Sequence, residues 1–263
     1  MQDFKTNLYR WYNDQKRDLP WRLTSDPYKI WISEIILQQT RVAQGIDYYH
    51  RFIKRFPTVN KLAIANEDEV LKLWQGLGYY SRARNLHQAA QTIANNHHGV
   101  FPGTYTRIKE LKGIGPYTAA AIASIAFNLP YPTIDGNVYR VLSRYFGIKT
   151  PIDSNQGKKE FEHLAEELID KDNPGMHNQA LMEFGALQCV PKNPDCAVCP
   201  LAQSCSAYIS NQVSLLPLKQ KKTKQLHRYF YYYLIGDKDF IYLEKRTGND
   251  IWKNLYQLPL IET

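Results

Sequence analysis

The chain of 263 residues carries 33 Lys and Arg against 25 Asp and Glu, which gives a net charge of +8 and a pI near 9.1, together with 19 tyrosines. A basic, aromatic-rich surface suits a polyanion, and nucleic acid is the first candidate partner. No segment approaches the roughly 18 apolar residues of a membrane span and the first residues do not resemble a signal peptide, so we expect a cytoplasmic protein of one or two domains.

The first 212 residues are predicted to be helical almost throughout. Apolar residues recur at helical spacing, Pro or Gly marks short loops, and no sustained alternation indicates strands. In "SDPYKIW", Asp26 is expected to cap a helix with Pro27 in its first turn. Residues 62–75, "LAIANEDEVLKLWQ", are expected to form one helix that ends at Gly76.

A single carboxylate interrupts the apolar part of "YKIWISEIILQQT". At helical spacing, Glu34 lies one turn from Ile30, Trp31 and Leu37. Desolvation in such surroundings raises a carboxyl pKa, so we expect Glu34 to hold a proton near neutral pH and to be able to donate it. The alternative is an edge position from which Glu34 reaches solvent or pairs with a cation such as Arg41.

Two glycines one residue apart stand in "LKGIGPYTAAAIAS", ahead of a helix of small residues. Gly113 and Gly115 permit a tight turn, and the helix that begins at Pro116 offers free backbone N–H groups and the positive end of its dipole. Such a turn docks a phosphate without reading a base, which predicts contact with a nucleic-acid backbone. An ordinary Gly-rich corner between two helices is the alternative.

Asp135 in "YPTIDGNVYRVLSRYF" directly precedes a predicted helix. N–H donors and the dipole at a helix N-terminus hold a carboxylate ionised, although a plain N-cap is the more common outcome. Beside Glu34 the contrast is informative, because one carboxylate stands in surroundings that favour its acid form and the other in surroundings that favour its anion. Such a pair is typical of an acid and a charge-stabilising partner in glycosidic cleavage.

All four cysteines lie in one short segment with the pattern C-x6-C-x2-C-x5-C, at Cys189, Cys196, Cys199 and Cys205. In a cytosolic chain such a group indicates a metal site rather than disulfides. Zinc is the default for four thiolates, but its sites usually contain two C-x2-C pairs and only one is present here. One loop with these spacings fits a [4Fe-4S] cluster better, and we expect that cluster largely to brace the loop.

The character of the chain changes after residue 212. Residues 213–228 are expected to form a solvated basic linker, since "SLLPLKQKKTKQLHR" contains a proline and no acid. The segments "YFYYYLIG" and "DFIYLEK" are then predicted to form two strands joined at Gly236 and Asp237. Residues 229–263 are too few for an independent β domain.

These segments together resemble the adenine-DNA glycosylases of the MutY family, in the helix-hairpin-helix superfamily of base-excision enzymes. The resemblance covers nearly all of residues 18–205 and is carried by "DLPWR", "DPYKIWISEIILQQTRV", "WQGLGYYSRARNL", "LKGIGPYTAAAIAS", "PTIDGNVYRVLSR", "NQALMEFGALQC" and the cysteine loop. It implies a mainly all-α, two-lobed helix-hairpin-helix glycosylase fold with an iron–sulfur cluster loop. The helical domain would span residues 1–212, with a six-helix barrel lobe at about 26–130 and a cluster lobe from 1–25 and 131–212.

The resemblance also implies an activity. Adenine mispaired with 8-oxoguanine or guanine in double-stranded DNA would be flipped out and its N-glycosidic bond hydrolysed, by a monomeric enzyme of base excision repair. Glu34 matches the catalytic acid that protonates N7 of adenine. Asp135 matches the carboxylate that stabilises the sugar cation or traps it covalently. Tyr117 and Asn137 match residues that assist beside that pair.

The resemblance implies DNA contacts and a cofactor as well. Gln39 and Tyr79 match the residues that push into the duplex, filling space and wedging beside the 8-oxoguanine, and Arg22 matches a base-pocket contact. The complete set that matches DNA or base contacts is Trp21, Arg22, Leu37, Gln39, Thr40, Tyr79, Gly113, Gly115 and Thr118. The four cysteines match the ligands of the [4Fe-4S] cluster.

Two other functions stay open, and the end of the chain departs from the family. Endonuclease III-like enzymes share the fold and the cluster but carry a lysine nucleophile where this chain has Tyr117, which predicts a glycosylase without strong lyase activity. A non-catalytic iron–sulfur DNA-binding protein would need only the hairpin and the cluster, and Glu34 and Asp135 disfavour it because they would repel phosphates. Residues 229–263 resemble only the first strands of a Nudix-like domain, so that fragment is expected to be incomplete and the preference for 8-oxoguanine to be weakened.

Overall fold

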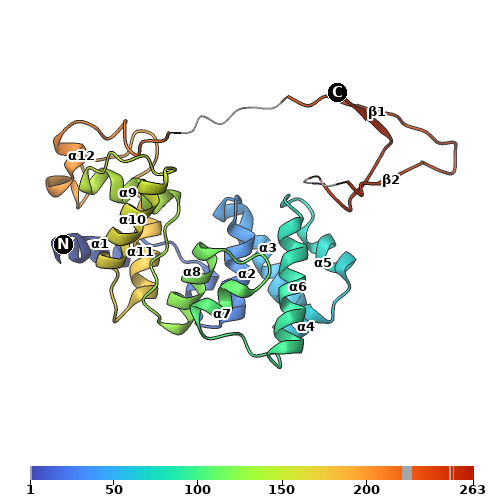
Figure 1. The fold of residues 1–263 in the computed structure, drawn as a ribbon, viewed down its shortest axis with the longest axis horizontal. Helices are drawn as coiled ribbons and strands as arrows, with labels where there is room; N and C mark the ends of the chain where they lie inside the picture. Colours follow the sequence, from blue (N-terminus) through green and yellow to red (C-terminus); the bar gives the residue numbers. More distant parts are fainter. Residues whose placement is uncertain (1, 221–226, 249, 251) are drawn as a thin grey trace.

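The computed structural model of the chain describes residues 2–220, 227–248, 250 and 252–263. Helices fill the region up to residue 209, and short strands follow near the C-terminus (Figure 1). The prediction of a mainly all-α fold with a β-containing C-terminal segment is therefore confirmed. None of the described helices is long and apolar enough to cross a membrane.

One hydrophobic core lies among helices that follow one another along the chain. They are α2 (Pro27–Leu37), α3 (Val42–Arg55), α4 (Val59–Ala63), α5 (Glu67–Trp74), α6 (Ser81–Asn96), α7 (Tyr105–Glu110) and α8 (Pro116–Phe127). Trp21 joins this core from the short 3-10 helix η1 (Pro20–Arg22), and Leu19 joins it from the position directly before η1. Asp26 caps α2 as predicted, because its carboxylate accepts a hydrogen bond of 2.9 Å from the backbone N–H of Tyr28.

A second core joins the first helix of the chain to helices that follow residue 135. It contains α1 (Gln2–Gln15), α9 (Gly136–Phe146), α10 (Asn155–Leu168) and α11 (Pro174–Leu187), and its buried side chains include Phe4, Leu8, Phe161 and Phe184. The cysteine segment, residues 189–205, follows α11 and contains η2 (Ala202–Ser204), and α12 (Ser206–Ile209) comes directly after it. Figure 1 shows these elements together at one end of the helical region, which is the two-lobed arrangement expected of the fold.

Helix α11 connects the two lobes because glycines let it approach its neighbours closely. A Cβ on Gly175 would stand 2.8 Å from the carbonyl oxygen of Ser124 in α8. A Cβ on Gly185 would stand 2.6 Å from the Cβ of Asn137 in α9. Any larger residue at either position would separate the helices that form the walls of the cavity described below.

The single helix predicted for residues 62–75 is wrong. The chain forms α4 and α5 instead, and the break contains Asn66, whose side chain accepts a hydrogen bond of 3.0 Å from the backbone N–H of Asp68 and so caps α5. The sequence contained this signal, since an Asn followed by three acidic residues is typical of a helix N-terminus. Residues 27–127 therefore hold seven helical segments, α2 to α8.

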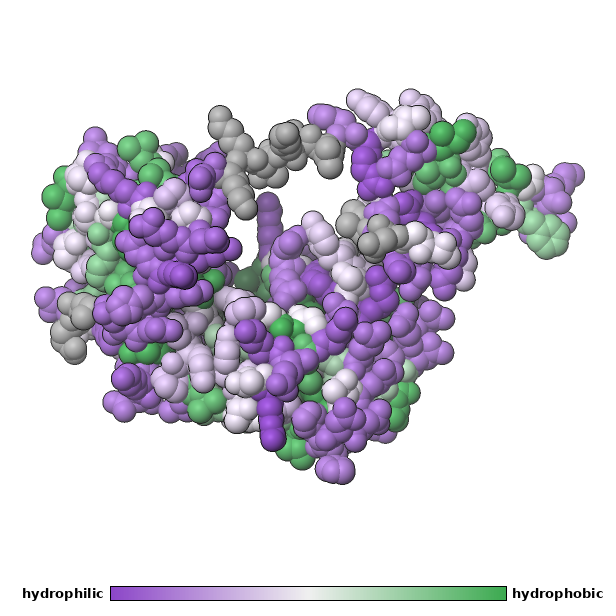
Figure 2. Space-filling view, viewed as in Figure 1, coloured by the Kyte–Doolittle hydropathy of each residue, from purple (hydrophilic) through white to green (hydrophobic). Residues whose placement is uncertain are grey.

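The C-terminal segment also differs from expectation. Strand β1 (Phe230–Tyr232) pairs with β4 (Leu260–Glu262), and β2 (Glu244–Lys245) pairs with β3 (Tyr256–Gln257). The predicted hairpin about Gly236 is reduced to an isolated bridge to Ile241. Many apolar side chains of this segment are exposed and appear as green atoms over the strands in Figure 2.

The first part of the predicted linker packs against the second lobe. Leu216 is buried and its carbonyl accepts a hydrogen bond of 3.1 Å from Arg144, while the Leu218 carbonyl accepts one of 3.0 Å from the Ile152 N–H. The basic stretch 221–226 lies outside the described residues.

Candidate active site

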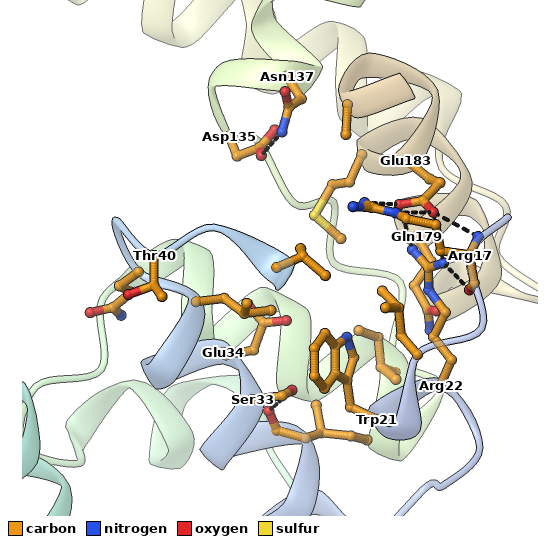
Figure 3. A pocket seen from close by; sticks show the side chains of 18 of the residues that line it. Arg17, Trp21, Arg22, Ser33, Glu34, Thr40, Asp135, Asn137, Gln179 and Glu183 are labelled. Carbon is orange, nitrogen blue, oxygen red and sulfur yellow. Dashed lines mark hydrogen bonds and ion pairs between the residues drawn. The ribbon is translucent and has the colours of Figure 1, made fainter. Parts of the chain in front are cut away.

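A cavity of about 360 Å³ lies between the two lobes and takes its walls from both cores. Its volume is sufficient for a small organic ligand, since such pockets begin at roughly 300 Å³. The predicted site residues that line it are Trp21, Arg22, Glu34, Leu37, Thr40, Tyr117, Asp135 and Asn137. Figure 3 shows Glu34 on one wall, and Asp135 with Asn137 on the opposite wall. Residues far apart in sequence thus meet in one cavity.

Glu34 is the acidic group of the α2 wall. It stands among buried apolar neighbours on its helix, and its side chain lines the cavity. Burial raises the pKa of Glu34 from 4.5 to about 7, a hydrogen bond with Tyr117 opposes this rise, and the nearby carboxylate of Asp135 adds to it. A large fraction of the molecules therefore carries a protonated Glu34 near neutral pH, as the apolar surroundings predict.

Tyr117 links the acid to the opposite lobe. Its hydroxyl lies 3.2 Å from the sulfur of Met182 on α11 and also hydrogen-bonds Glu34. Burial raises the pKa of the Tyr117 phenol well above its usual value, and the two carboxylates act in the same direction. The phenol therefore stays neutral and can serve as a hydrogen-bond donor.

Asp135 is fixed as the N-cap of α9. Its Oδ1 accepts a hydrogen bond of 2.8 Å from the backbone N–H of Val138, and its Oδ2 accepts one of 2.8 Å from the Asn137 side chain. Arg140 holds Asn137 in turn, through a 2.8 Å bond to its Oδ1. Donors thus surround the Asp135 carboxylate, and both of its oxygens have a partner.

Glu183 is a site residue that the sequence argument missed. It projects from α11 into the cavity wall, is almost fully buried, and forms ion pairs with Arg17 (2.6 Å) and Arg22 (2.8 Å). Burial alone would raise the pKa of Glu183, but hydrogen bonds from the two arginines lower it to about 2. The sequence signal was the one that identified Glu34, a lone carboxylate within the apolar run "ALMEFGAL".

The other predicted DNA contacts lie outside this cavity. Gln39 and Tyr79 are exposed and occupy turns in which both adopt a positive φ, 58° and 46° respectively. Gly113 has a φ of +79° in the turn between α7 and α8, whereas Gly115 is extended and caps α8. Thr118 is buried and accepts a hydrogen bond of 3.3 Å from Gln38.

The four cysteines line a second cavity beside α9. None forms a disulfide, and Arg144 approaches the sulfur of Cys189 at 3.4 Å while its backbone carbonyl lies 3.5 Å from the sulfur of Cys205. Burial, with the neighbouring thiolates, raises the pKa of the Cys199 thiol to about 11. Within the described part of the chain, no three His, Cys, Asp or Glu side chains form a group that could hold a single metal ion.

Comparison with known proteins places the chain in a family. The pattern of HhH-GPD superfamily base excision DNA repair proteins matches residues 32–171. The adenine DNA glycosylase of Buchnera aphidicola subsp. Baizongia pistaciae is 42% identical over 262 residues, which cover 97% of this chain and 73% of that protein. This chain belongs to the adenine DNA glycosylases of that superfamily.

A further relative and two solved structures are also similar to the chain. The human adenine DNA glycosylase is 42% identical over 213 residues, covering 78% of this chain and 39% of that protein. The structure of a thermostable thymine-DNA glycosylase aligns with a TM-score of 0.74 and 31% identity over 80% of this chain and 96% of the other. An endonuclease III bound non-covalently to DNA aligns with a TM-score of 0.67 at 21% identity over 80% and 97%, which supports the shared fold.

Proposed function

We propose that the chain flips adenine, mispaired with 8-oxoguanine or guanine, out of double-stranded DNA and removes it by hydrolysis of the N-glycosidic bond. The observation that carries the proposal is one cavity between the lobes with two carboxylates in contrasting surroundings, Glu34 with a pKa near 7 and Asp135 held by hydrogen-bond donors. Family membership supplies the adenine specificity, since the relatives of 42% identity are adenine DNA glycosylases.

The proposed chemistry divides the work between the two carboxyl groups. Glu34 donates its proton to N7 of the flipped adenine, so that the electron pair of the breaking bond between C1′ and N9 leaves with a neutral base. General acid catalysis of this kind contributes roughly 10²- to 10⁴-fold to a rate. Asp135 then stabilises the positive charge on the sugar or forms a bond to C1′. Water adds at C1′, displacing Asp135 where that bond has formed, and gives its proton to the Glu34 carboxylate, which restores the acid.

Other wall residues orient these groups and the base. Asn137 keeps the Asp135 carboxylate aimed by its 2.8 Å hydrogen bond, and neutral Tyr117 holds Glu34. Trp21 gives an apolar wall for the purine. The guanidinium of Arg22 is anchored by Glu183, which fixes it in the wall of the cavity, where it would contact the base.

The composition of the cavity favours hydrolysis over strand cleavage. A lyase step needs an amine that forms a Schiff base with the sugar, and no lysine stands among the described residues that line the cavity. Tyr117 occupies the position where endonuclease III-like enzymes have their lysine and stays protonated. These features support a monofunctional glycosylase.

The duplex would contact the surface beside the cavity. The space beside Gly115 is open, because a Cβ built there would meet no atom within 4 Å. The φ of Gly115, −89°, is one that any residue can adopt, so the backbone conformation does not explain the glycine, whereas close approach of a ligand would. The N-terminus of α8 at this point offers backbone N–H groups to a phosphate. Gln39 and Tyr79, on neighbouring exposed turns, would enter the base stack.

The cysteine segment suits a [4Fe-4S] cluster with Cys189, Cys196, Cys199 and Cys205 as ligands. Four free thiols line one cavity, and Arg144 offers positive charge to the sulfur of Cys189. A bound cluster would crosslink the loop of residues 189–205 and hold it against α9.

The test is single-turnover cleavage of a duplex with one adenine opposite 8-oxoguanine, run with and without alkali. The expected result is a strand break only after alkali, together with no protein–DNA adduct after borohydride reduction. Glu34→Gln should abolish the break but keep duplex binding, which would separate an enzyme from a non-catalytic binding protein. Borohydride trapping in high yield would instead favour the lyase alternative, and a parallel duplex with adenine opposite guanine measures the preference for 8-oxoguanine.

A further inference from the structure

Arg82 joins the two turns that present Gln39 and Tyr79. It lies in the first turn of α6, and its side chain reaches the C-terminal end of α2 and the loop that follows α5. Nη1 donates hydrogen bonds to the carbonyl oxygens of Ile35 (2.9 Å), Ile36 (3.1 Å) and Gln38 (2.5 Å), and Nη2 to those of Leu77 (3.1 Å) and Gly78 (3.2 Å). One guanidinium therefore contacts two segments that are distant in sequence.

Two of these carbonyls directly precede the residues that would enter DNA. The Gln38 carbonyl lies in the peptide plane whose rotation sets φ of Gln39, and the Gly78 carbonyl lies in the plane that sets φ of Tyr79. Both φ values are positive, 58° and 46°, a region that residues other than glycine seldom adopt and that persists where surrounding structure enforces it. By holding both planes, Arg82 holds both side chains.

The position of the guanidinium suits this task in two further ways. It lies at the C-terminal end of α2, where carbonyl groups lack intrahelical partners and the helix dipole favours positive charge. It also lies 5.2 Å from the ring centroid of Trp74 and 5.9 Å from that of Tyr79, so that it contacts one of the two exposed side chains directly. Trp74 is fully buried, so the guanidinium that packs against it has a fixed position from which it restrains the exposed Tyr79.

We infer that Arg82 is a positioning residue for entry into the duplex, which fixes Gln39 and Tyr79 relative to each other so that both insert together when adenine is extruded. This inference rests on the proposed function. A lysine would keep the charge, but its single ammonium group cannot reach the carbonyls of two turns as the planar fork of arginine does. Arg82→Lys therefore keeps the positive charge but removes the hydrogen bonds to both turns, so that it tests the hydrogen bonds alone.

The experiment compares Arg82→Lys with Arg84→Lys, a matched control in the same helix, where Arg84 donates to the Lys253 carbonyl at 3.1 Å. Fluorescence of 2-aminopurine placed beside the mispair reports unstacking of the duplex, and single-turnover release reports excision. Arg82→Lys should lose the unstacking signal and keep its helical content. Excision should slow by about 100-fold, which is the cost expected when catalytic groups and substrate are misplaced by a small distance. Arg84→Lys should match the original protein in both assays.

The pH profile separates positioning from general damage. If Arg82 acts only through the turns, Arg82→Lys keeps the midpoint of the pH dependence of excision, because the surroundings of Glu34 are intact. Unchanged unstacking in Arg82→Lys, a shifted midpoint, or equal loss in Arg84→Lys would overturn the inference. If the original protein unstacks the duplex but does not release adenine, the proposed function is wrong. The comparison of unstacking between the two variants would still decide the role of Arg82.

Discussion

Replacing Glu34 by Gln should stabilise the protein above neutral pH while removing its activity. A pKa of about 7 in place of 4.5 means that the folded protein keeps a proton on Glu34 between these values, where the unfolded chain has lost it. The free energy of unfolding therefore falls as pH rises through this window. Since one pKa unit corresponds to about 1.4 kcal/mol, ionised Glu34 costs about 3 kcal/mol at pH 8, and Gln removes that cost.

The assay is urea unfolding of both proteins at matched pH values between 4.5 and 8, with circular dichroism as the signal. The gain in unfolding free energy from Glu34→Gln should approach about 3 kcal/mol at pH 8 and vanish near pH 4.5. A gain that is equal at both ends of the range would refute the reasoning, because a change in packing alone does not follow protonation.

Glu183→Gln is the matched control. It changes a second glutamate of the same cavity, but one whose pKa is lowered in the folded protein, whereas that of Glu34 is raised. The two arginines lower the pKa of Glu183 to about 2, so its ionised form stabilises the fold above pH 4.5 and this stability is lost as pH falls toward 2. The substitution should therefore destabilise by about 3 kcal/mol, with little change between pH 5 and 8. A pH-dependent loss in that range would show that the two glutamates are not independent.

Further outcomes follow from the same geometry. The second-order rate of adenine release should fall about tenfold per pH unit above pH 7, as Glu34 loses its proton, and a flat profile from pH 7 to 9 would exclude Glu34 as the acid. Tyr117→Phe removes a hydrogen bond that lowers the pKa of Glu34, so the midpoint of that profile should move to higher pH; movement to lower pH would contradict the contact. Cys199→Ser should lower the iron content per chain and weaken duplex binding, whereas full iron content would remove Cys199 from the ligand set.

Local signals in the sequence predicted local structure well. Asp26 and Asp135 were recognised as helix caps because a cap depends on the few residues beside it. The turn about Gly113 was recognised for the same reason. The break before Asn66 was missed although its signal is equally local, because the apolar periodicity continues across it.

Long-range partners could not be predicted in this way. The arginines that hold Glu183 lie more than 160 residues before it, and the carbonyls that Arg82 contacts include some 44 to 47 residues away. Neither pairing leaves a periodic pattern in the sequence, since each depends on how the lobes and turns are packed. Strand β1 was likewise given the wrong neighbour, because β4 lies about 30 residues beyond it and no turn signal connects the two.

The second core gives the chain an order of assembly during synthesis. The lobe that carries Glu34 is built from consecutive residues, so it can fold as soon as they leave the ribosome. The lobe that carries Asp135 cannot, because α1 must wait for α11, which ends at Leu187. Until then the second core lacks Ala180, Leu181 and Phe184, which α11 supplies. The cavity between the lobes is therefore complete only after α11 has emerged.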